Sequence, residues 1–456
     1  MKRLRAMLCA LLAGVLLVGC AVQPRTDDKQ GGGAAVDLTK YAAREAAYPA
    51  YPQEPRYEDY FDENGEGDWD AYMAAEDEYT AAMQKLGKGR LDQESAAPVL
   101  DFADRTAGAI FADSENRVYS PISLYAALAM LTEVTDGGTK RQVMDLLAAD
   151  DAATLRQQIK DLWIGVYTDD DQSVCRLANA AFLRENADVN QETVDTLADW
   201  HFASTYRVPM GTEEADKAVA GWLNQNTGGL LSEETGNIRT DGNDLLRLYN
   251  TIYYKSGWQD AFKSSQTKQD TFTAADGAAQ TVDFMHRTES GGYRKGEGYT
   301  AASRSLNYGR MVFVLPDERV TPESLLQRQG FLAELTGDYN AAELVWSVPK
   351  FDVKSSTELN EVLQALGVTD AFDMTEADFT PLTDYGAFLS SAMQAARVKI
   401  DEEGVEAAAY TELVCADSAM MEVPPTVEMD LDRPFLFVIF DYNNIPLFVG
   451  TVNALH

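Results

Sequence analysis

Helical and strand-like patterns occupy different halves of this chain, and this division constrains the fold more than any other feature. Apolar residues recur at helical spacing in six stretches, at 99–111, 124–131, 139–147, 153–163, 191–200 and 214–224. Strand-like runs follow at 249–254, 310–315 and 344–348, and then around 397 and across 427–452. Helices first and strands later are typical of an α+β domain with several sheets. At 456 residues and 45% hydrophobic content, the chain can bury such a core without disulfides.

Residues 402–411 form an unusual connector between two strand-like stretches, 396–400 and 433–440. Connectors of this kind are usually short, polar and rich in turn-forming residues. This one is long, and its first half is small and apolar, Gly-Val-Glu-Ala-Ala-Ala. Its composition leaves two interpretations open, namely an exposed loop of low complexity and a strand that has not yet joined a sheet.

The N-terminus has the pattern of a targeting segment. Lys2, Arg3 and Arg5 precede an apolar run, Met7 to Val18, which is short for a membrane-spanning helix. The run ends in Leu-Val-Gly-Cys20, which resembles the lipobox of bacterial lipoproteins. The resemblance implies that residues 1–19 are removed and that Cys20 carries a diacylglycerol anchor. We therefore expect an extracytoplasmic lipoprotein of the cell surface or envelope, tethered or released. A plain signal peptide and an anchor helix are the alternatives.

Residues 20–94 do not show the pattern of a core. Gly31 to Gly33 form a flexible joint, and an acidic, tyrosine-rich tract follows that contains Pro49, Pro52 and Pro55. We interpret the segment as a spacer between the lipidated Cys20 and a domain at 95–456, with a short amphipathic helix at 70–86. A partner-binding role of the tyrosines is the alternative.

The charge and cysteine content narrow the classes of partner. The net charge is -35, which disfavours nucleic acid and anionic lipid surfaces as partners and keeps the protein soluble. It favours cationic partners if it has a binding role at all. Of four cysteines, Cys9 lies in the predicted signal and Cys20 is the predicted lipidation site. Cys175 and Cys415 remain, which is too few for a disulfide framework, and we treat them as unpaired.

Sequence chemistry disfavours an enzyme. Only three histidines occur, His201, His286 and His456, and the chain has no G-x-S-x-G, H-E-x-x-H, C-x-x-C or G-x-x-x-x-G-K-[ST] motif. We therefore expect no catalytic residues, no metal and no cofactor. The one enzymatic alternative is a hydrolase of the cell envelope that uses two carboxylates. With 73 Asp and Glu residues in the chain, however, pairs of carboxylates carry little information.

An ordered series of motifs resembles the serpin family, the serine protease inhibitors. The resemblance covers roughly residues 97–456. Its motifs, in chain order, are Asn116-Arg-Val-Tyr-Ser-Pro-Ile-Ser123, Asn179-Ala-Ala-Phe-Leu183, Trp222-Leu-Asn224 with Thr227-Gly-Gly229, Asn250-Thr-Ile-Tyr-Tyr-Lys-Ser-Gly-Trp258, Pro349-Lys-Phe351, Leu366-Gly-Val368 to Phe372, Arg433-Pro-Phe-Leu-Phe437 and Pro446-Leu-Phe-Val-Gly450. Any single motif is weak, and the order of the series carries the resemblance.

The resemblance implies one α+β domain with three β-sheets, about nine helices and an exposed reactive-centre loop. It also implies a single-use, monomeric inhibitor whose partners are target serine proteases. The protease would attack the loop and remain bound as an acyl-enzyme while the cleaved loop inserts into the large sheet as a new strand. A non-inhibitory serpin, acting as a binding module or as a protease substrate, is the alternative.

The connector then corresponds to the loop hinge, formed by Glu402, Glu403, Gly404, Val405, Glu406, Ala407, Ala408 and Ala409. In an inserted strand alternate side chains would face the body, among them Val405, Ala407 and Ala409, which are small or apolar. No proline interrupts 402–423, so the strand could form its ladders without losing a donor.

Other positions follow from the resemblance. The shutter and breach positions, where the sheet opens, map onto Asn116, Ser120, Ser123, Asn179, Trp258 and Gln394. Gln394 stands where many serpins have a histidine, so it keeps a donor and an acceptor but has no pH-dependent charge. Ala395 beside it replaces a frequent lysine.

The expected reactive bond is Ser418-Ala419, counted forward from Gly404. Counting back from Pro424 gives the alternative Met420, Met421 and Glu422. No Arg or Lys occurs between 402 and 432. The sequence therefore predicts an elastase-like, subtilisin-like or chymotrypsin-like target rather than a trypsin-like one.

Overall fold

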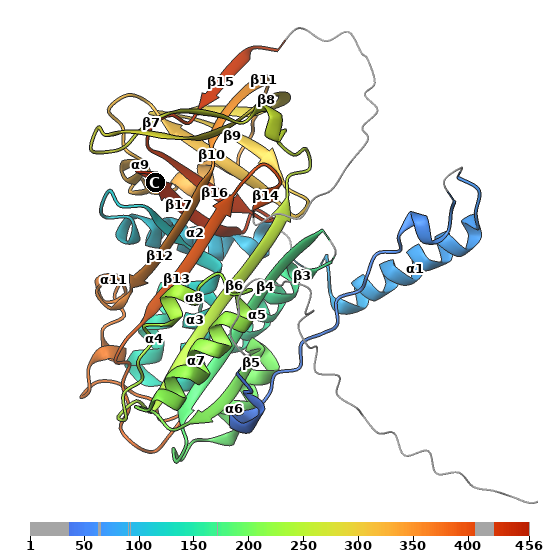
Figure 1. Ribbon diagram of the computed structural model, residues 1–456. Helices are drawn as coiled ribbons and strands as arrows, with labels where there is room; N and C mark the ends of the chain where they lie inside the picture. Colours follow the sequence, from blue (N-terminus) through green and yellow to red (C-terminus); the bar gives the residue numbers. More distant parts are fainter. Residues whose placement is uncertain are drawn as a thin grey trace, which may run out of the picture.

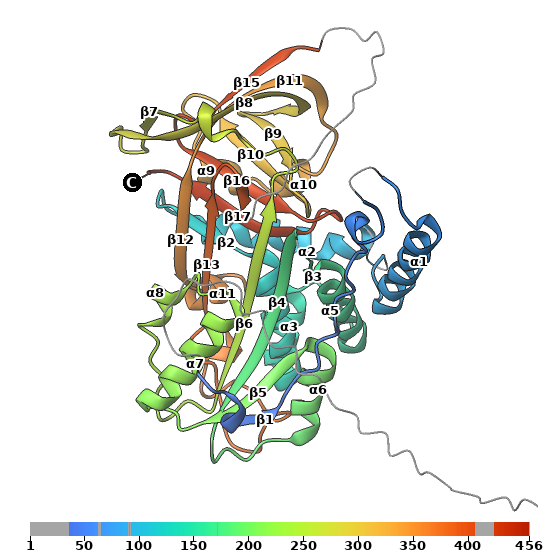
Figure 2. The same ribbon diagram turned by 45° about the vertical axis from the view of Figure 1, so that its right-hand side comes forward.

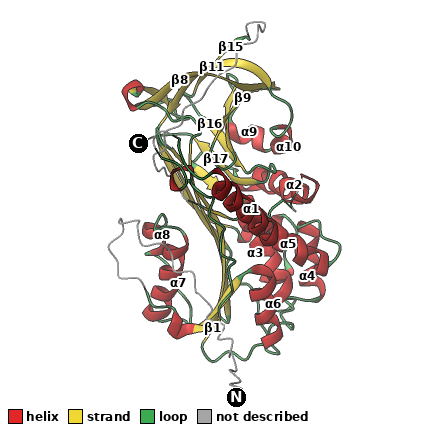
Figure 3. Ribbon diagram, turned by 90° about the vertical axis from the view of Figure 1, so that its right-hand side faces the viewer, coloured by secondary structure: helices red, strands yellow, loops and turns green. Residues whose placement is uncertain are grey.

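Two β-sheets form the framework of the molecule, and helices cover both faces of the first sheet (Figures 1 and 3). The computed structural model describes residues 36–62, 65–89, 91, 93–170, 172–405 and 424–455. In this part of the chain helices dominate up to residue 226 and strands dominate after residue 246, as the sequence patterns predict.

The first sheet contains the longest strands of the helical half. Its order is β1 (Ala42–Arg44), β5 (Ala203–Val208), β4 (Ser173–Arg184), β6 (Leu246–Gly257), β14 (Gly404–Val405), β13 (Met393–Ile400) and β12 (Phe351–Glu358), with β3 (Thr168–Asp169) paired to β4. The strands β4 and β5 are parallel, and the other pairs are antiparallel.

The second sheet contains most of the C-terminal strands. Its order is β15 (Thr426–Asp430), β11 (Asn340–Pro349), β8 (Ala279–Gly296), β9 (Tyr299–Ser305), β10 (Arg310–Pro316), β16 (Phe435–Phe440), β17 (Pro446–Val452) and β2 (Arg117–Tyr119), with β7 (Lys268–Thr273) paired to β8. Every residue of β16 and β17 is buried, which explains their continuous apolar sequences.

The expectation of three sheets needs a correction. Hydrogen bonds join the described strands into two sheets, because β8 is 18 residues long and runs through both halves of the second one. Residues 284–293 of β8 pair with β11, and residues 293–296 pair with β9. One continuous strand thereby merges what we expected to be separate sheets, and its length was not evident from its polar, glycine-containing sequence.

The helices lie in two groups on opposite faces of the first sheet (Figure 3). On one face lie α2 (Gln93–Ile110), α3 (Pro121–Val134), α4 (Gly137–Leu146), α5 (Ala152–Val166) and α6 (Gln191–His201). The other face carries α7 (Glu213–Asn226) and α8 (Ser232–Thr235). The short α9 (Pro322–Leu326), α10 (Phe331–Glu334) and α11 (Asn360–Ala365) bring the described helices after residue 92 to ten, close to the predicted nine.

Helix α3 is the centre of the hydrophobic core. It is buried on nearly all sides, from Pro121 to Val134, because it lies between the first sheet and the helices α2, α4, α5 and α6. An apolar sequence without a polar face is typical of such a central helix. The side chain of Ser120 accepts a hydrogen bond from the amide of Ser123 and begins the helix, which is followed at once by Pro121.

Part of the predicted spacer lies on the domain instead. Strand β1 pairs with β5 at the edge of the first sheet, and Tyr41 is buried. The ring of Tyr48 stacks on Trp163 at 5.5 Å between centroids, and its hydroxyl donates to the carbonyl oxygen of Phe202 at 3.1 Å. The spacer interpretation is therefore wrong for residues 36–51. The physical reason is that the tyrosine rings supply the apolar area that a solvated spacer lacks.

Helix α1 (Trp69–Leu86) confirms the amphipathic helix expected at 70–86. Asp68 caps its first turn by accepting from the amide of Ala71, and Gly87 ends it in the left-handed conformation. The helix lies at one side of the domain in both Figure 1 and Figure 2. Lys88 then returns the chain to the domain by donating to the carbonyl oxygen of Gly165 at 2.8 Å. None of the helices in the described part combines the length and the apolar character that crossing a bilayer requires.

Candidate functional site

The first sheet has a vacant strand position between β6 and β13. In the described part of the chain these two strands are connected only through the two residues of β14. Strand β6 pairs with β4 on its far edge, and β13 pairs with β12, so each has one edge without a ladder below β14. Backbone groups on such edges are the standard template for adding another strand. We call this position the slot.

Gly404 and Val405 already occupy the upper end of the slot. Gly404 lies opposite Gly257, and Val405 lies opposite Ser256 on one side and Ile400 on the other. A Cβ on Gly404 would lie 2.6 Å from the Cα of Gly257, so no larger residue fits there. Val405 is 2% exposed and points into the core. Gly404 and Val405 therefore form a short strand in the sheet, and Val405 faces the core.

Glu402 anchors the hinge just before it enters the slot. Its carboxylate lies 2.8 Å from the ammonium of Lys350 and accepts a hydrogen bond from the hydroxyl of Thr267 at 2.7 Å. Burial raises the pKa of Glu402, but these two partners outweigh it and hold the pKa below its usual range. The backbone carbonyl of the same residue accepts from the amide of Phe262 at 2.9 Å.

Trp258 holds the same segment from the side of β6. Its amide donates to the carbonyl of Glu403 at 2.9 Å, and its indole nitrogen donates to the carbonyl of Asp401 at 3.0 Å. The ring is 2% exposed and lies below the guanidinium of Arg304, at 4.9 Å from its centroid. Arg304 is in turn paired with Glu289 at 2.8 Å. The breach position predicted for Trp258 therefore fits its contacts with the hinge.

The N-terminal turn of α3 bridges the two strands that border the slot. The amide of Ser120 donates to the side-chain oxygen of Gln394 on β13 at 2.9 Å, and the amide nitrogen of Gln394 donates back to the Ser120 carbonyl at 3.0 Å. On the other side, the hydroxyl of Ser123 donates to the side chain of Asn250 on β6. One helix turn thus contacts both edges of the slot. Gln394 uses both functions of its amide, as the substitution for histidine suggested.

A buried polar chain extends this contact away from the slot. Asn250 donates to the side chain of Asn179, and Asn179 donates to the carbonyl of His201 at 2.6 Å. The imidazole of His201 lies 3.1 Å from the carboxylate of Glu133, which also pairs with Arg156 at 2.6 Å. Burial raises the pKa of Glu133, but the bonds to His201 and Arg156 outweigh it and lower the pKa to about 2.

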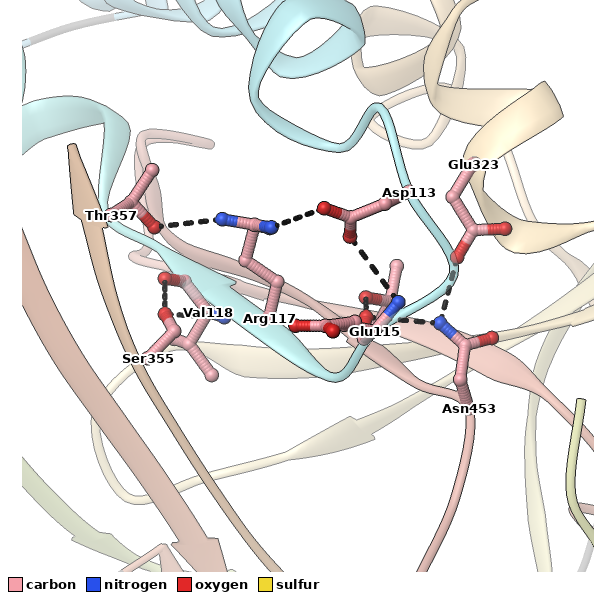
Figure 4. Close-up of polar contacts among 9 residues, drawn as sticks. Asp113, Glu115, Arg117, Val118, Glu323, Ser355, Thr357 and Asn453 are labelled. Atoms are coloured by element: carbon pink, nitrogen blue, oxygen red, sulfur yellow. Dashed lines mark hydrogen bonds and ion pairs between the residues drawn. The ribbon is translucent and has the colours of Figure 1, made fainter. Parts of the chain in front are cut away.

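Asn116 lies apart from these residues, although we grouped it with them. Its side chain donates to the carbonyl of Ala454 at 2.7 Å and accepts from the amide of Asn453 at 2.6 Å, so it fixes the C-terminal residues. Its neighbours in β2 join the two sheets (Figure 4). There Ser355 of β12 donates to the carbonyl of Val118 at 2.6 Å. Asn116 therefore supports the domain near the site without touching the slot.

Several predicted site residues lie outside the described part of the chain. They are the rest of the hinge, Glu406 to Ala409, the expected reactive residues Ser418 and Ala419 with their alternatives Met420, Met421 and Glu422, and the predicted lipidation site Cys20. Within the described part, no group of three His, Cys, Asp or Glu side chains lies close enough to hold a metal ion.

Sequence reasoning missed three contributors to the site: Asn250, Lys350 and Thr267. Asn250 and Lys350 stand inside two of the motifs, but the motifs do not indicate which of their side chains faces the slot. For Asn250 a signal was present, since it alternates with Ile252 and Tyr254 on one strand. Thr267 stands outside all the motifs, and its contact with Glu402 across 135 residues has no local signal.

The fold thus combines two β-sheets, helices on both faces of the first sheet and a vacant strand position next to β14. Comparison with known proteins agrees. Residues 99–455 match the family model "Serpin (serine protease inhibitor)", so the chain belongs to the serpin family.

Individual relatives support this assignment. The chain is 28% identical to Serpin B6 of Macaca fascicularis over 75% of this chain and 94% of that protein. It is 26% identical to Alpha-1-antiproteinase 2 of Equus caballus over 75% of this chain and 82% of that protein. The solved structure of the thermophilic serpin tengpin in its native state aligns with a TM-score of 0.72 at 25% identity, over 81% of this chain and 96% of tengpin.

Proposed function

We propose that this serpin traps a serine protease as a covalent acyl complex and inserts its cleaved loop into the slot. The observation that carries the proposal is the vacant strand position with Gly404 and Val405 already at its upper end. The protease serine would attack the carbonyl carbon of the residue before the cut, expected to be Ser418. The bond to the nitrogen of Ala419 would break, that amine would leave with a proton, and the protease would stay attached as an ester.

Filling the slot supplies the driving force. A central strand gains backbone hydrogen bonds to both neighbours, each worth about 1 kcal/mol net. An inserted segment of roughly fifteen residues would extend about 50 Å at the usual rise per residue. The gain is therefore on the order of ten kcal/mol or more, which is enough to drag an attached protease and to make the native state kinetically rather than thermodynamically persistent.

The expected targets follow from the loop sequence. Ser418, Ala419, Met420 and Met421 are uncharged residues that suit a small-to-medium apolar pocket, and the segment 402–432 contains no Arg or Lys. Elastase-like, subtilisin-like and chymotrypsin-like enzymes should therefore form complexes that survive denaturing electrophoresis, whereas trypsin should not. Mass spectrometry of the released C-terminal fragment identifies the cut bond. No stable complex with any member of a broad protease panel would contradict the proposal and favour a non-inhibitory serpin.

A hinge substitution tests the mechanism itself. Val405→Arg would force a charge into a position that is 2% exposed, so insertion should stall and the protein should be cleaved as a substrate. Glu403→Arg is the matched control, because this neighbouring side chain is exposed. We expect complex formation to be lost in the first variant and kept in the second. Equal inhibition by both variants would show that the slot does not receive the loop.

We also propose that the mature protein is a monomeric lipoprotein anchored through Cys20 outside the cytoplasm. The Leu-Val-Gly-Cys20 motif supports this proposal. Expression in a bacterium fed with labelled fatty acid should label the wild-type chain and leave Cys20→Ser unlabelled. Equal labelling of both would refute the anchor without affecting the inhibitory mechanism.

A further inference from the structure

Four aromatic rings gather where α1 begins, and Figure 1 shows this helix at one side of the domain. Tyr57 and Phe61 stack with their centroids 4.1 Å apart and their planes at 10°. Trp69 lies 5.6 Å and Tyr72 lies 5.9 Å from Phe61. Trp69 is 57% exposed and Tyr57 is 47% exposed, so large ring faces meet solvent. We call Tyr57, Phe61, Trp69 and Tyr72, with the bridge between Phe61 and Gly67, the aromatic turn.

A folded turn presents these rings. Phe61 and Gly67 form a β-bridge, and the amide of Asp68 donates to the carbonyl of Tyr60 at 3.1 Å. A Cβ on Gly67 would lie 2.7 Å from the Cα of Phe61, so only glycine allows this close approach. Asp68 then caps α1. The backbone thereby fixes both ends of the turn, and the fixed backbone positions the exposed rings.

The surroundings of the rings are strongly acidic. Between Glu54 and Glu78 the sequence has eleven Asp or Glu residues and a single basic one, Arg56, which lies 3.0 Å from Asp59. Glu58, Glu66 and Asp70 are exposed, and the described part of the chain gives them no ion pair. Aromatic faces are electronegative, so rings and carboxylates attract cations together.

The one basic residue of this stretch, Arg56, is held by Asp59, so the surface around the rings keeps a strongly negative charge. An anionic membrane or a second copy of this chain, with its net charge of -35, would be repelled. Charge complementarity therefore selects a cationic occupant.

We propose that the aromatic turn is a docking surface for a lysine- or arginine-rich segment of a partner protein. The ammonium or guanidinium groups would lie over Tyr57 and Trp69, and the carboxylates around them would hold the rest of the segment. This surface is independent of the slot. It would bring a cationic protein to the inhibitor by contacts that do not involve the reactive loop.

The test uses the full chain and a fluorescein-labelled octalysine peptide, with fluorescence anisotropy as the readout. Because the whole protein is acidic, the test must distinguish binding at the aromatic turn from the nonspecific electrostatic attraction of octalysine to the rest of the surface. Tyr57→Ala together with Trp69→Ala should raise the Kd about tenfold, as expected for the loss of two cation–π contacts. Tyr385→Ala is the control, since this tyrosine is 65% exposed and lies in a distant loop. Equal Kd values for the double variant and the wild type would overturn the proposal.

Charge-matched variants complete the test. Glu58→Gln, Glu66→Gln and Asp70→Asn together should weaken octalysine binding, whereas Glu361→Gln, Glu376→Gln and Asp384→Asn together should leave it nearly unchanged. Equal weakening by both triple variants would mean diffuse attraction only and would also overturn the proposal. Soluble oligosaccharides provide a further comparison. If Tyr57→Ala together with Trp69→Ala weakens oligosaccharide binding but leaves octalysine binding unchanged, the surface is a carbohydrate site instead. Unchanged melting temperatures would show that each variant is folded.

Discussion

Glu402 offers the sharpest test of how the hinge is held. Its carboxylate contacts Lys350 at 2.8 Å and Thr267 at 2.7 Å, and its side chain is only 13% exposed. Glu402→Gln keeps the shape and an acceptor oxygen but removes the charge. Glu402→Ala removes both contacts. The first substitution therefore isolates the charge, and the second measures the whole anchor.

The magnitude follows from the two bonds. A hydrogen bond to a charged group contributes about 1.5–3 kcal/mol, and a neutral one contributes about half as much. Lys350 is 37% exposed, so water compensates part of the loss. We expect Glu402→Gln to cost about 1 kcal/mol and Glu402→Ala to cost about 2 kcal/mol of native-state stability. Glu403→Gln is the control and should cost almost nothing, because Glu403 is exposed.

The assay can use a probe inside the site. The indole nitrogen of Trp258 donates to the carbonyl of Asp401, so this tryptophan, one of six in the chain, contributes a signal from the hinge to the fluorescence. The midpoint of urea-induced fluorescence change should decrease in the order wild type, Glu402→Gln, Glu402→Ala. The lowered pKa of Glu402 also fixes the sign of the pH effect. A glutamate ordinarily has a pKa of 4.5, so the stabilisation is complete above that pH and is lost as the pH falls through the lower native value. If Glu403→Gln lowers the midpoint as much as Glu402→Ala, the anchor is not specific and the reasoning fails.

Three further predictions concern the contacts around the slot and the domain edge. Gln394→Leu should destabilise the native state by about 2 kcal/mol in urea unfolding, because it breaks both hydrogen bonds to the backbone of Ser120; a neutral effect would show that these bonds do not matter. Tyr48→Ala should cost about 2–3 kcal/mol, since the ring stacks on Trp163, and a loss under about 0.5 kcal/mol would mean that residues 36–51 are only loosely attached. Glu133→Gln should make the native state less stable at neutral pH and its stability less dependent on acid, because Glu133, with a pKa of about 2, stabilises the protein fully above pH 4.5 and loses this contribution progressively as the pH falls from 4.5 to about 2; an unchanged acid titration would refute this assignment.

The elements of the domain could be predicted because local patterns report them. The helix expected at 214–224 is α7, and the strand expected at 310–315 is β10. The composition of the connector at 402–411 left a loop and a strand both open, and in its described part Gly404 and Val405 form a short strand. The family resemblance then assigned Ser120, Ser123 and Gln394 to one place, and their hydrogen bonds confirm that neighbourhood.

Contacts between distant segments were not predictable in the same way. Nothing near Tyr48 in the sequence indicates that it stacks on Trp163, far along the chain, so the segment around it looked like a spacer. The prediction of three sheets was wrong for a related reason. Strand β8 pairs with β11 along one part of its length and with β9 along another, and no local pattern indicates this. The roles of Lys350 and Thr267 likewise depend on where Glu402 is placed by the whole fold.

The positions of the two loop ends explain why cleavage should trigger insertion. The loop leaves the first sheet at Val405 and joins the second sheet at Thr426, where β15 forms a parallel ladder of five residue pairs with β11. An intact loop that filled the slot would have to descend along β6 and return to β15, so every inserted residue would require another for the return. Deep insertion would then unpair β15, at a cost of about 5 kcal/mol for about five backbone bonds. A cut between the two anchors removes this constraint and leaves the gain from the slot. In the proposed mechanism the barrier in the native state would therefore depend on the β15–β11 ladder as well as on the hinge, and the target protease would release it by the same step that joins the protease to the loop.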